Sequence, residues 1–575
     1  MIKILKNLTL YKWSVLAVFA LVFLQSMSDL YLPTLMSDII DKGVVVGDTN
    51  YIWKIGGFML LISAIGATAS VFASYYSSKA AMGMGRDIRR NVFHHVENFS
   101  LQEFDKMGTA SLITRTTNDI TQIQQVVIMM LRMVISAPIM LIGGVIMAVS
   151  KDAKLSLIIV VTMPILIFVI LFIFSKGMPL FQMVQKKIDK LNLVLRENLT
   201  GIRVIRAFNR EKEERKRLKN ANEELTDISI RVNRLVAYMM PIMMLIMNLT
   251  VVAVIWFGGI RIDNGNMEIG DLMAFIQYVM QIMFSLVMAT MMFIMIPRAA
   301  VSANRINEVL DMEPVILDEG TKKADREHGT LEFDNVTFYY PGAEEPALAN
   351  ISFEAKPGET TAIIGGTGSG KSTLVNLIPR FYDISNGSIR INGVDIREAT
   401  QEEIRSKIGF VPQKAILFTG TIADNIRFGK EDATEEEMKQ AARTAQAEEF
   451  INLMPDGYDT VIEQGGTNLS GGQKQRLSIA RALVRKPDLY IFDDSFSALD
   501  FKTDAKLRAA LKEETKDKAV IIVAQRVSTV INADRIIVLD EGCIAGIGTH
   551  KELLATNELY REIVKSQLSE EEMAS

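Results

Sequence analysis

Cysteine is almost absent from this chain of 575 residues, since Cys543 is the only one present. A single thiol cannot form a disulfide within the chain, so a disulfide-stabilised scaffold is excluded and a reducing compartment is indicated. The chain also lacks a surplus of basic residues, because 63 Lys and Arg stand against 67 Asp and Glu and give a net charge of −4. This balance argues against a nucleic-acid-binding surface. No internal repeat and no low-complexity tract interrupts the sequence.

No Ala-x-Ala-like cleavage site follows the first apolar stretch, which is also longer than the core of a signal peptide. We therefore predict that this stretch is retained as a membrane helix. Apolar residues make up 49% of the chain and the mean hydropathy is +0.20, which is high for a soluble protein. Runs that each supply the ~20 apolar residues needed to cross a bilayer lie at 13–35, 55–78, 125–150, 155–175, 239–261 and 271–297.

The distribution of basic residues predicts how these six runs are oriented. The long polar gaps at 79–124 and 176–238 are rich in Lys and Arg, whereas the connections at 41–54, 151–154 and 262–270 are short and carry few. The positive-inside rule places both long gaps, the N-terminus and the C-terminal half in the cytoplasm. We therefore predict a multi-pass protein of the cell membrane with both termini cytoplasmic. The alternative is that one weak run is a buried helix of a soluble domain.

Beyond residue 311 no run of membrane length occurs, and the composition changes. We predict a six-helix transmembrane domain at residues 1–310 and a polar, aperiodic linker at residues 311–329. The segment LEFDNVTFYY at 331–340 alternates like a strand, and strand-like and helix-like segments then alternate along the chain. Residues 330–575 are thus predicted to form an α/β domain with a largely parallel sheet.

The stretch GGTGSGKST matches the phosphate-binding loop G-x-x-x-x-G-K-S, and a predicted strand precedes it while a predicted helix follows. Glycines let the backbone N–H groups converge on one phosphate, and the start of the helix adds a positive dipole end. Lys371 is predicted to reach the β- and γ-phosphates and Ser372 to bind Mg²⁺. The predicted ATP contacts of this loop are Gly365, Gly366, Thr367, Gly368, Ser369, Gly370, Lys371, Ser372 and Thr373.

A second anion-binding motif reads LSGGQ and comprises Leu469, Ser470, Gly471, Gly472 and Gln473. Ser470 can cap the helix that follows, and the glycines leave its amides open. Because one ATP does not need both motifs on one chain, the economical interpretation is that two nucleotide domains face each other and complete each other's sites. With the two motifs in this order, the chain resembles the half-transporters of the ABC exporter family.

The resemblance covers essentially the whole chain and implies ATP and Mg²⁺ as cofactors. It implies that Tyr340 stacks on adenine, although the adjacent Tyr339 could do so instead. Gln413 matches the family's loop glutamine, which reaches Mg²⁺ near the membrane-domain contact, and Asp493 would hold Mg²⁺ through water. The loop between the two ATP sites is matched by Ser497, Ala498, Leu499 and Asp500.

Two positions depart from the family pattern. Asp494 stands where the family usually has the Glu that acts as general base, and Gln525 where it usually has a His that contacts the γ-phosphate. Asp is one methylene shorter than Glu, and a misplacement of about 1 Å can reduce a rate on the order of a hundredfold. This pattern resembles the heterodimeric exporters with one degenerate ATP site. We therefore expect a second half-transporter as partner, with a homodimer that tolerates both residues as the alternative.

The resemblance also implies two cytoplasmic coupling helices, near Leu101–Lys106 and Ala207–Glu214. In the spans, Asp29 breaks the apolarity of the first run and Pro33 follows one turn later. Asp29 either lines the transport path or lies in the headgroup zone or against a neighbouring helix. Gln277 and Gln281 are predicted to line a polar cavity.

Methionine is concentrated in the membrane half, since only Met312, Met438, Met454 and Met573 of 32 follow residue 311. Flexible thioethers adapt to many apolar shapes, although packing or lipid contact is the alternative for any one of them. The function predicted is ATP-driven export of hydrophobic or amphipathic compounds, including cationic drug-like ones, with membrane lipids and such small molecules as partners. Alternatives are a homodimeric lipid or peptide exporter, or an ATP-binding regulatory or channel-type subunit.

Overall fold

The computed structural model describes residues 1–318, 320–324 and 329–567. The chain divides into two compact units. The helical unit comprises Met1–Glu97 and Ala110–Met312, and the α/β unit comprises Asn98–Thr109 and Glu313–Ser575. Between Leu310 and Leu331 the described residues form no regular helix or strand, and linker residues 319 and 325–328 lie outside the described part.

The described part of the chain has six helices long and apolar enough to cross a membrane, so the six-span prediction is confirmed. They extend well beyond the bilayer length because polar, helix-forming segments continue the apolar runs. The long helices are α2 (Lys12–Asp38), α3 (Thr49–Glu97), α6 (Ile120–Lys151), α7 (Leu157–Thr200), α9 (Glu211–Asp263) and α10 (Ile269–Leu310). Shorter segments are α1 (Ile2–Leu5), a 3-10 turn (Lys6–Tyr11), π-helical turns (Ile39–Val44 and Arg115–Asp119), α5 (Thr109–Thr114) and α8 (Ile202–Ala207).

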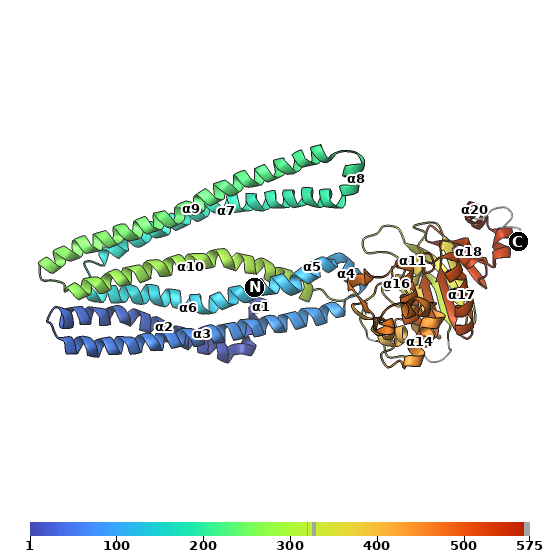
Figure 1. Ribbon diagram of the computed structural model, residues 1–575, viewed down its shortest axis with the longest axis horizontal. Coiled ribbons are helices and arrows are strands. Elements are labelled where there is room, and N and C mark those ends of the chain that lie inside the picture. Colours follow the sequence, from blue (N-terminus) through green and yellow to red (C-terminus); the bar gives the residue numbers. More distant parts are fainter. Residues whose placement is uncertain (319, 325–328, 568–575) are drawn as a thin grey trace. The chain divides into compact units, whose positions relative to one another are not determined.

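Within the helical unit the helices pack mainly in pairs. α2 lies against α3, α6 against α10, and α7 against α9 (Figure 1). α10 supplies much of the core, since Phe275, Tyr278 and Ile282 are buried together with Leu166 of α7 and Val254 of α9.

The second predicted coupling helix is wrong in its position. The short helix α8 is Ile202–Ala207, and α9 begins only at Glu211. Asn209 has a φ of 52°, a left-handed conformation that interrupts a right-handed helix, so Ala207–Glu214 spans a turn and not one helix.

The α/β unit is built on a six-stranded sheet in the order β12-β11-β3-β10-β9-β6. Its strands from β11 to β6 are parallel, and β12 pairs with β11 antiparallel. Bounds in this sheet are β3 (Thr360–Gly365), β6 (Ile408–Val411), β9 (Leu489–Asp493), β10 (Ala519–Val523), β11 (Arg535–Asp540) and β12 (Cys543–Gly548). The antiparallel strands are β1 (Leu331–Phe338), β2 (Leu348–Ala355), β4 (Asn386–Ile391), β5 (Val394–Asp395), β7 (Gly420–Thr421) and β8 (Val461–Ile462).

Helices cover this sheet on both faces, and the α/β prediction is confirmed. They are α11 (Lys371–Leu377), α12 (Gln401–Ser406), α13 (Ile422–Arg427), α14 (Glu435–Thr444), α15 (Glu448–Asn452), α16 (Gly471–Leu483), α17 (Phe501–Glu514), α18 (Val527–Val530), α19 (His550–Thr556) and α20 (Glu558–Gln567). Successive strand residues point to opposite faces. Ile364 therefore packs into one core while Ile363 packs into the other.

The first predicted coupling helix forms as α4 (Leu101–Met107) and belongs to the α/β unit. Ser100 and Glu103 cap it reciprocally, so the break after α3 is fixed by a capping box. The Tyr382 hydroxyl donates to Asp105 of α4 at 2.9 Å, and burial together with this carboxylate raises the pKa of Tyr382. The α/β unit thus holds α4 by a specific polar contact.

Candidate functional sites: a phosphate loop and an intramembrane cavity

The predicted phosphate loop joins β3 to α11 at the carboxyl edge of the parallel sheet. Gly368 and Gly370 have φ values of 85° and 96°, which only glycine adopts without strain. A Cβ at Gly366 or Gly368 would meet no atom within 4 Å, so the loop's backbone is open on that side. At Gly365, in contrast, a Cβ would lie 2.2 Å from the Leu539 carbonyl, so the strand end needs glycine for packing.

Lys371 is a buried cation that lies along this loop. Its Nζ donates to the carbonyl oxygens of Gly365 at 2.9 Å and Gly366 at 2.6 Å. Burial lowers its pKa, and the nearby carboxylates of Asp494 and Asp493 oppose that shift. These bonds hold the Lys371 ammonium group within the loop, where the phosphate oxygens of a nucleotide bind in this motif.

Oxygen ligands suited to magnesium converge at the end of β9. The Ser372 hydroxyl donates to Asp493 Oδ1 at 3.3 Å, and burial raises the pKa of the Asp493 carboxyl, with the Asp494 charge raising it further. A bound Mg²⁺ would supply the positive charge that this buried carboxylate lacks. The pair of a hydroxyl and a carboxylate fits the oxygen ligands that Mg²⁺ prefers.

The two unusual residues meet directly. Gln525 Nε2 donates to Asp494 Oδ2 at 2.9 Å, and Gln413 Nε2 donates to the same oxygen at 3.3 Å. Asp494 has a φ of 45°, a left-handed conformation for a non-glycine residue. Three residues predicted from separate segments thus form one cluster, in which two amides hold one carboxylate oxygen.

Tyr340 lies beside the helix that starts at the phosphate loop, two residues beyond the end of β1. Its hydroxyl shares a hydrogen bond of 3.0 Å with Thr373, and its ring contacts Phe338 and Tyr382 edge-on. Among the described residues, Tyr339 makes no hydrogen bond or ring contact with the loop, so the geometry favours Tyr340 as the ring next to the nucleotide.

The LSGGQ segment begins α16 as its motif predicts. Ser470 accepts from the Gln473 amide at 3.3 Å, and the Gln473 side chain accepts from the Ser470 amide at 2.8 Å, which is a capping box. A Cβ at Gly471 would meet no atom within 4 Å, whereas one at Gly472 would lie 3.2 Å from the Ala498 carbonyl.

The loop that follows β9 is tied to the same cluster. The Ser497 hydroxyl donates to the Asp494 carbonyl at 2.9 Å, and Asp500 caps α17 by accepting from the Thr503 amide at 2.9 Å. Leu499 is buried, while Ala498 faces Gly472 through its carbonyl. The start of α16 and the loop from Ser497 to Asp500 therefore lie together.

Comparison with known families agrees with this arrangement. Residues 15–286 match the ABC transporter transmembrane region, and residues 348–497 match the ABC transporter family. This chain belongs to the ABC transporters. It is an exporter half-transporter, a multi-pass membrane protein whose ATPase domain couples ATP hydrolysis to transport.

Several relatives match over most of their length. An uncharacterized ABC transporter ATP-binding protein of Mycobacterium tuberculosis is 44% identical over 562 residues, 97% of this chain and 96% of that protein. A fatty acid ABC transporter ATP-binding/permease protein of Mycobacterium bovis is 35% identical over 480 residues, 83% and 76% of the two chains. An ATP-dependent lipid A-core flippase of Chromobacterium violaceum is 31% identical over 536 residues, 93% and 92% of the two chains.

A solved structure gives the same fold for the transporter. A bacterial Atm1-family ABC exporter with ATP bound superimposes with a TM-score of 0.79 at 26% identity, covering 97% of this chain and 99% of that chain. The ABC exporter fold predicted from the sequence is therefore confirmed.

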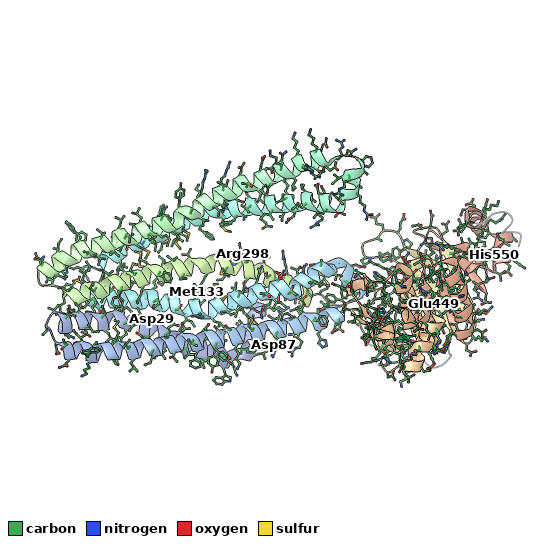
Figure 2. All side chains as sticks on the ribbon, viewed as in Figure 1. Asp29, Asp87, Met133, Arg298, Glu449 and His550 are labelled. Atoms are coloured by element: carbon green, nitrogen blue, oxygen red, sulfur yellow. The ribbon has the colours of Figure 1, made fainter. Side chains whose placement is uncertain are left out.

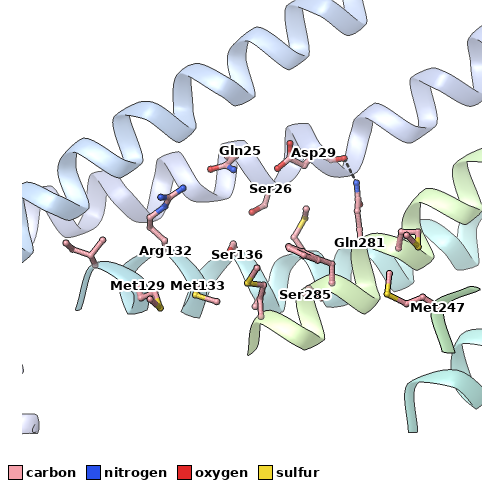
Figure 3. A pocket seen from close by; sticks show the side chains of 16 residues that line it. Gln25, Ser26, Asp29, Met129, Arg132, Met133, Ser136, Met247, Gln281 and Ser285 are labelled. Atoms are coloured by element: carbon pink, nitrogen blue, oxygen red, sulfur yellow. Dashed lines mark hydrogen bonds between the residues drawn. The ribbon is translucent and has the colours of Figure 1, made fainter. Parts of the chain in front are cut away.

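The helical unit of this transporter contains a cavity of about 740 Å³ between α2, α6 and α10, with Met247 of α9 at one side. Six of the residues that line it are methionines, namely Met129, Met133, Met140, Met247, Met280 and Met288 (Figure 3). Polar side chains also line it, among them Asp29 of α2 and Arg132 of α6. Figure 2 places Asp29 and Met133 within the helix bundle.

A proline explains how Gln281 is placed in this wall. Pro33 has no N–H, so it cannot donate to the carbonyl of Asp29, four residues earlier in α2. Gln281 of α10 donates its Nε2 to that carbonyl at 3.0 Å (Figure 3). The neighbouring hydroxyl of Tyr278 donates to the Leu30 carbonyl at 3.1 Å. The Gln281 amide of α10 therefore satisfies the carbonyl that the proline leaves open.

The structure brings Asp29 and Gln281 to one cavity but leaves Gln277 exposed and outside its lining. Arg132 also lines the cavity, although it was not among the residues predicted from the sequence. The signal was a single basic residue inside the apolar run at 125–150, which is costly in a membrane and therefore informative.

Proposed function

We propose that this half-transporter exports hydrophobic or amphipathic compounds through the cavity lined by α2, α6 and α10. The cavity carries the proposal, because its volume of about 740 Å³ lies within the range of small-molecule sites. Flexible methionines let one wall fit many apolar shapes, and the charged side chains favour cargo with a polar head.

ATP would bind at the phosphate loop with Lys371, and Tyr340 would lie next to its base. Mg²⁺ would be held by Ser372 and Asp493, and by Gln413 as its family position implies. The start of α16 would present Gly471 and Gly472 to the ATP of the facing half. Closure of the two halves would change the access of the cavity through α4, and hydrolysis would reset it.

We further propose that the facing half is a different chain. Asp494 is shorter than the usual Glu, and its Oδ2 already accepts from two glutamine amides. Two amides therefore already occupy an oxygen that a general base would offer to the attacking water. The chain's own phosphate loop would therefore hold ATP and hydrolyse it slowly, while its intact LSGGQ segment completes a faster site.

The test is to purify the chain alone and compare its ATPase rate with that of a variant that combines Asp494→Glu with Gln525→His. Restoring both residues should raise the rate by on the order of a hundredfold. Asp494→Asn, which keeps the shape and removes the base, is the matched control and should stay at or below the wild-type rate. A wild-type chain that forms identical pairs and already hydrolyses ATP as fast as the restored variant would contradict the proposal.

A second candidate is a homodimeric lipid exporter, which is favoured by the names of the relatives that move fatty acids and lipid A-core. Transport itself is tested with a fluorescent cationic amphiphile in inverted vesicles. Uptake should need ATP, be abolished by Lys371→Ala and fall in Asp29→Asn. Leakage that does not depend on ATP would instead indicate a channel-type subunit.

A further inference from the structure

The cavity presents charged groups of both signs that do not pair with each other. Asp29 and Arg132 both line it, yet no ion pair joins them among the described residues. A cargo with a single charge would be attracted by one of these side chains and repelled by the other. Each unpaired charge in a low-dielectric wall costs free energy until an opposite charge arrives.

The end of the cavity at Asp29 presents two hydrogen-bond acceptors, the Asp29 carboxylate, which the Gln25 side chain also contacts, and the side-chain oxygen of Gln281. The Asp29 carbonyl can only accept, so the Gln281 amide nitrogen must face it, and this fixes the opposite orientation of Gln281 Oε1. Gln281 Oε1 is buried and has no hydrogen-bond partner in the described structure. A buried acceptor without a donor is costly, so this oxygen calls for an N–H or O–H group from a ligand.

The other end of the cavity presents a hydrogen-bond donor, the guanidinium group of Arg132. Arg132 is half-buried, and the described residues give its guanidinium neither an ion pair nor a hydrogen bond. Figure 3 shows it extending from α6 toward the turn of α2 that carries Gln25. A planar guanidinium is suited to bind a phosphate or carboxylate through two parallel hydrogen bonds.

We propose that the cavity binds an amphiphile whose head group joins an anionic oxygen group to a protonated amine that carries N–H. The anionic group pairs with Arg132, the ammonium donates to Asp29 and Gln281 Oε1, and the apolar chains lie on the methionines. This assignment rests on the proposed export function and names its cargo class. A quaternary ammonium carries the same charge without an N–H and leaves Gln281 Oε1 unpaired.

The experiment measures binding to the purified full-length protein in detergent by isothermal titration calorimetry. Four short-chain probes with matched tails are compared: a phosphatidylethanolamine, the corresponding phosphatidylcholine, a phosphatidylglycerol and a primary alkylamine. The phosphatidylethanolamine should bind on the order of tenfold tighter than the phosphatidylcholine, because one site built to bind an N–H rejects an analogue that lacks it. Both single-charge probes should bind more weakly than the phosphatidylethanolamine.

Variants separate the two ends of the site. Arg132→Gln should remove the advantage of the probes that carry phosphate. Asp29→Asn should weaken the ethanolamine and choline probes alike, because it removes the charge that attracts their ammonium groups, whereas Gln281→Leu removes the unpaired Oε1 and should abolish the discrimination between them. Arg298→Gln is the matched control, since Arg298 is an exposed arginine of α10 outside the cavity lining, and it should bind all four probes as the wild type does.

If a variant does not fold, the affinities of the four probes for the wild-type protein are sufficient to test the assignment. Equal affinities for the ethanolamine and choline probes, or tightest binding of a single-charge probe, would overturn the assignment. Uptake in vesicles distinguishes failure of this head-group assignment from failure of the proposed export function. Selective binding without ATP-driven movement would refute export and leave the site, whereas ATP-driven uptake of single-charge dyes without head-group selectivity would refute the site alone.

Discussion

The most direct test of the packing in the helical unit is the contact between Gln281 and the backbone freed by Pro33. Gln281→Leu removes the amide that donates to the Asp29 carbonyl at 3.0 Å. With Pro33 in place no backbone N–H four residues later can take over, and an unsatisfied backbone carbonyl among membrane helices is costly. In Pro33→Ala the backbone N–H of the alanine can donate to the Asp29 carbonyl, so the Gln281 side chain is no longer needed there.

The expected energy follows from these contacts. Hydrogen bonds between membrane helices contribute roughly 0.6 kcal/mol on average and up to about 1.7 kcal/mol. Because this bond satisfies an otherwise open carbonyl, we expect Gln281→Leu to lower the free energy of unfolding by about 1 kcal/mol. This corresponds to a melting temperature lower by about 2 °C. In the Pro33→Ala background the same substitution should cost close to nothing, so the coupling energy of the double-mutant cycle should be about 1 kcal/mol.

The chain provides its own probe for this cycle. Its three tryptophans, Trp13, Trp53 and Trp256, all lie in the helical unit, so thermal unfolding followed by tryptophan fluorescence reports that unit. Tyr278→Phe is a control, because its hydroxyl binds the carbonyl of Leu30, and the residue four positions later is Thr34, which has an N–H, so the cost should not depend on Pro33. An equal effect of Gln281→Leu in both backgrounds would show that the amide does not compensate for the proline.

Three further predictions concern the α/β unit. Tyr382→Phe removes the hydroxyl that binds Asp105 on α4, so transport per ATP hydrolysed in proteoliposomes should fall while ATP binding stays unchanged; an unchanged ratio would show that this contact does not couple. Ser470→Ala should cost about 1 kcal/mol through the lost N-cap and speed hydrogen exchange at the start of α16, whereas Ser470→Thr should not. Burial beside Tyr560 lowers the pKa of His550 (Figure 2), so its contribution to stability is present above about pH 6.5 and is lost as the pH falls through the lower folded pKa. Circular-dichroism melting at pH 7.5 and 5.5 should therefore show a smaller difference for His550→Gln than for the wild type, and identical differences would exclude this role.

The phosphate loop was predictable from sequence because its geometry is local. Gly368 and Gly370 fix the turn, and Lys371 follows as the first residue of α11. The order of strands and helices then places the ends of β6, β9 and β10 at the same edge. Nothing beyond the parallel sheet is needed to bring Gln413, Asp494 and Gln525 together.

The cavity could not be predicted in the same way, because its residues come from helices whose mutual rotation the sequence does not encode locally. Gln281 and the Asp29 carbonyl that it satisfies are 252 positions apart in the sequence, and Tyr278 and Leu30 are 248 positions apart. Gln277 lies one turn from Gln281 on α10, yet it is exposed outside the cavity. Periodicity within one helix therefore could not separate the two glutamines.

The chain's connectivity suggests how the two sites communicate. α4 belongs to the α/β unit, but it is joined directly to α3 on one side and, through α5, to α6 on the other. α6 carries Arg132 in the cavity wall, so a displacement of the α/β unit that carries α4 with it must act on that wall through the covalent chain. We therefore expect the α4 contact at Tyr382 to transmit the state of this chain's own ATP site to the helical unit.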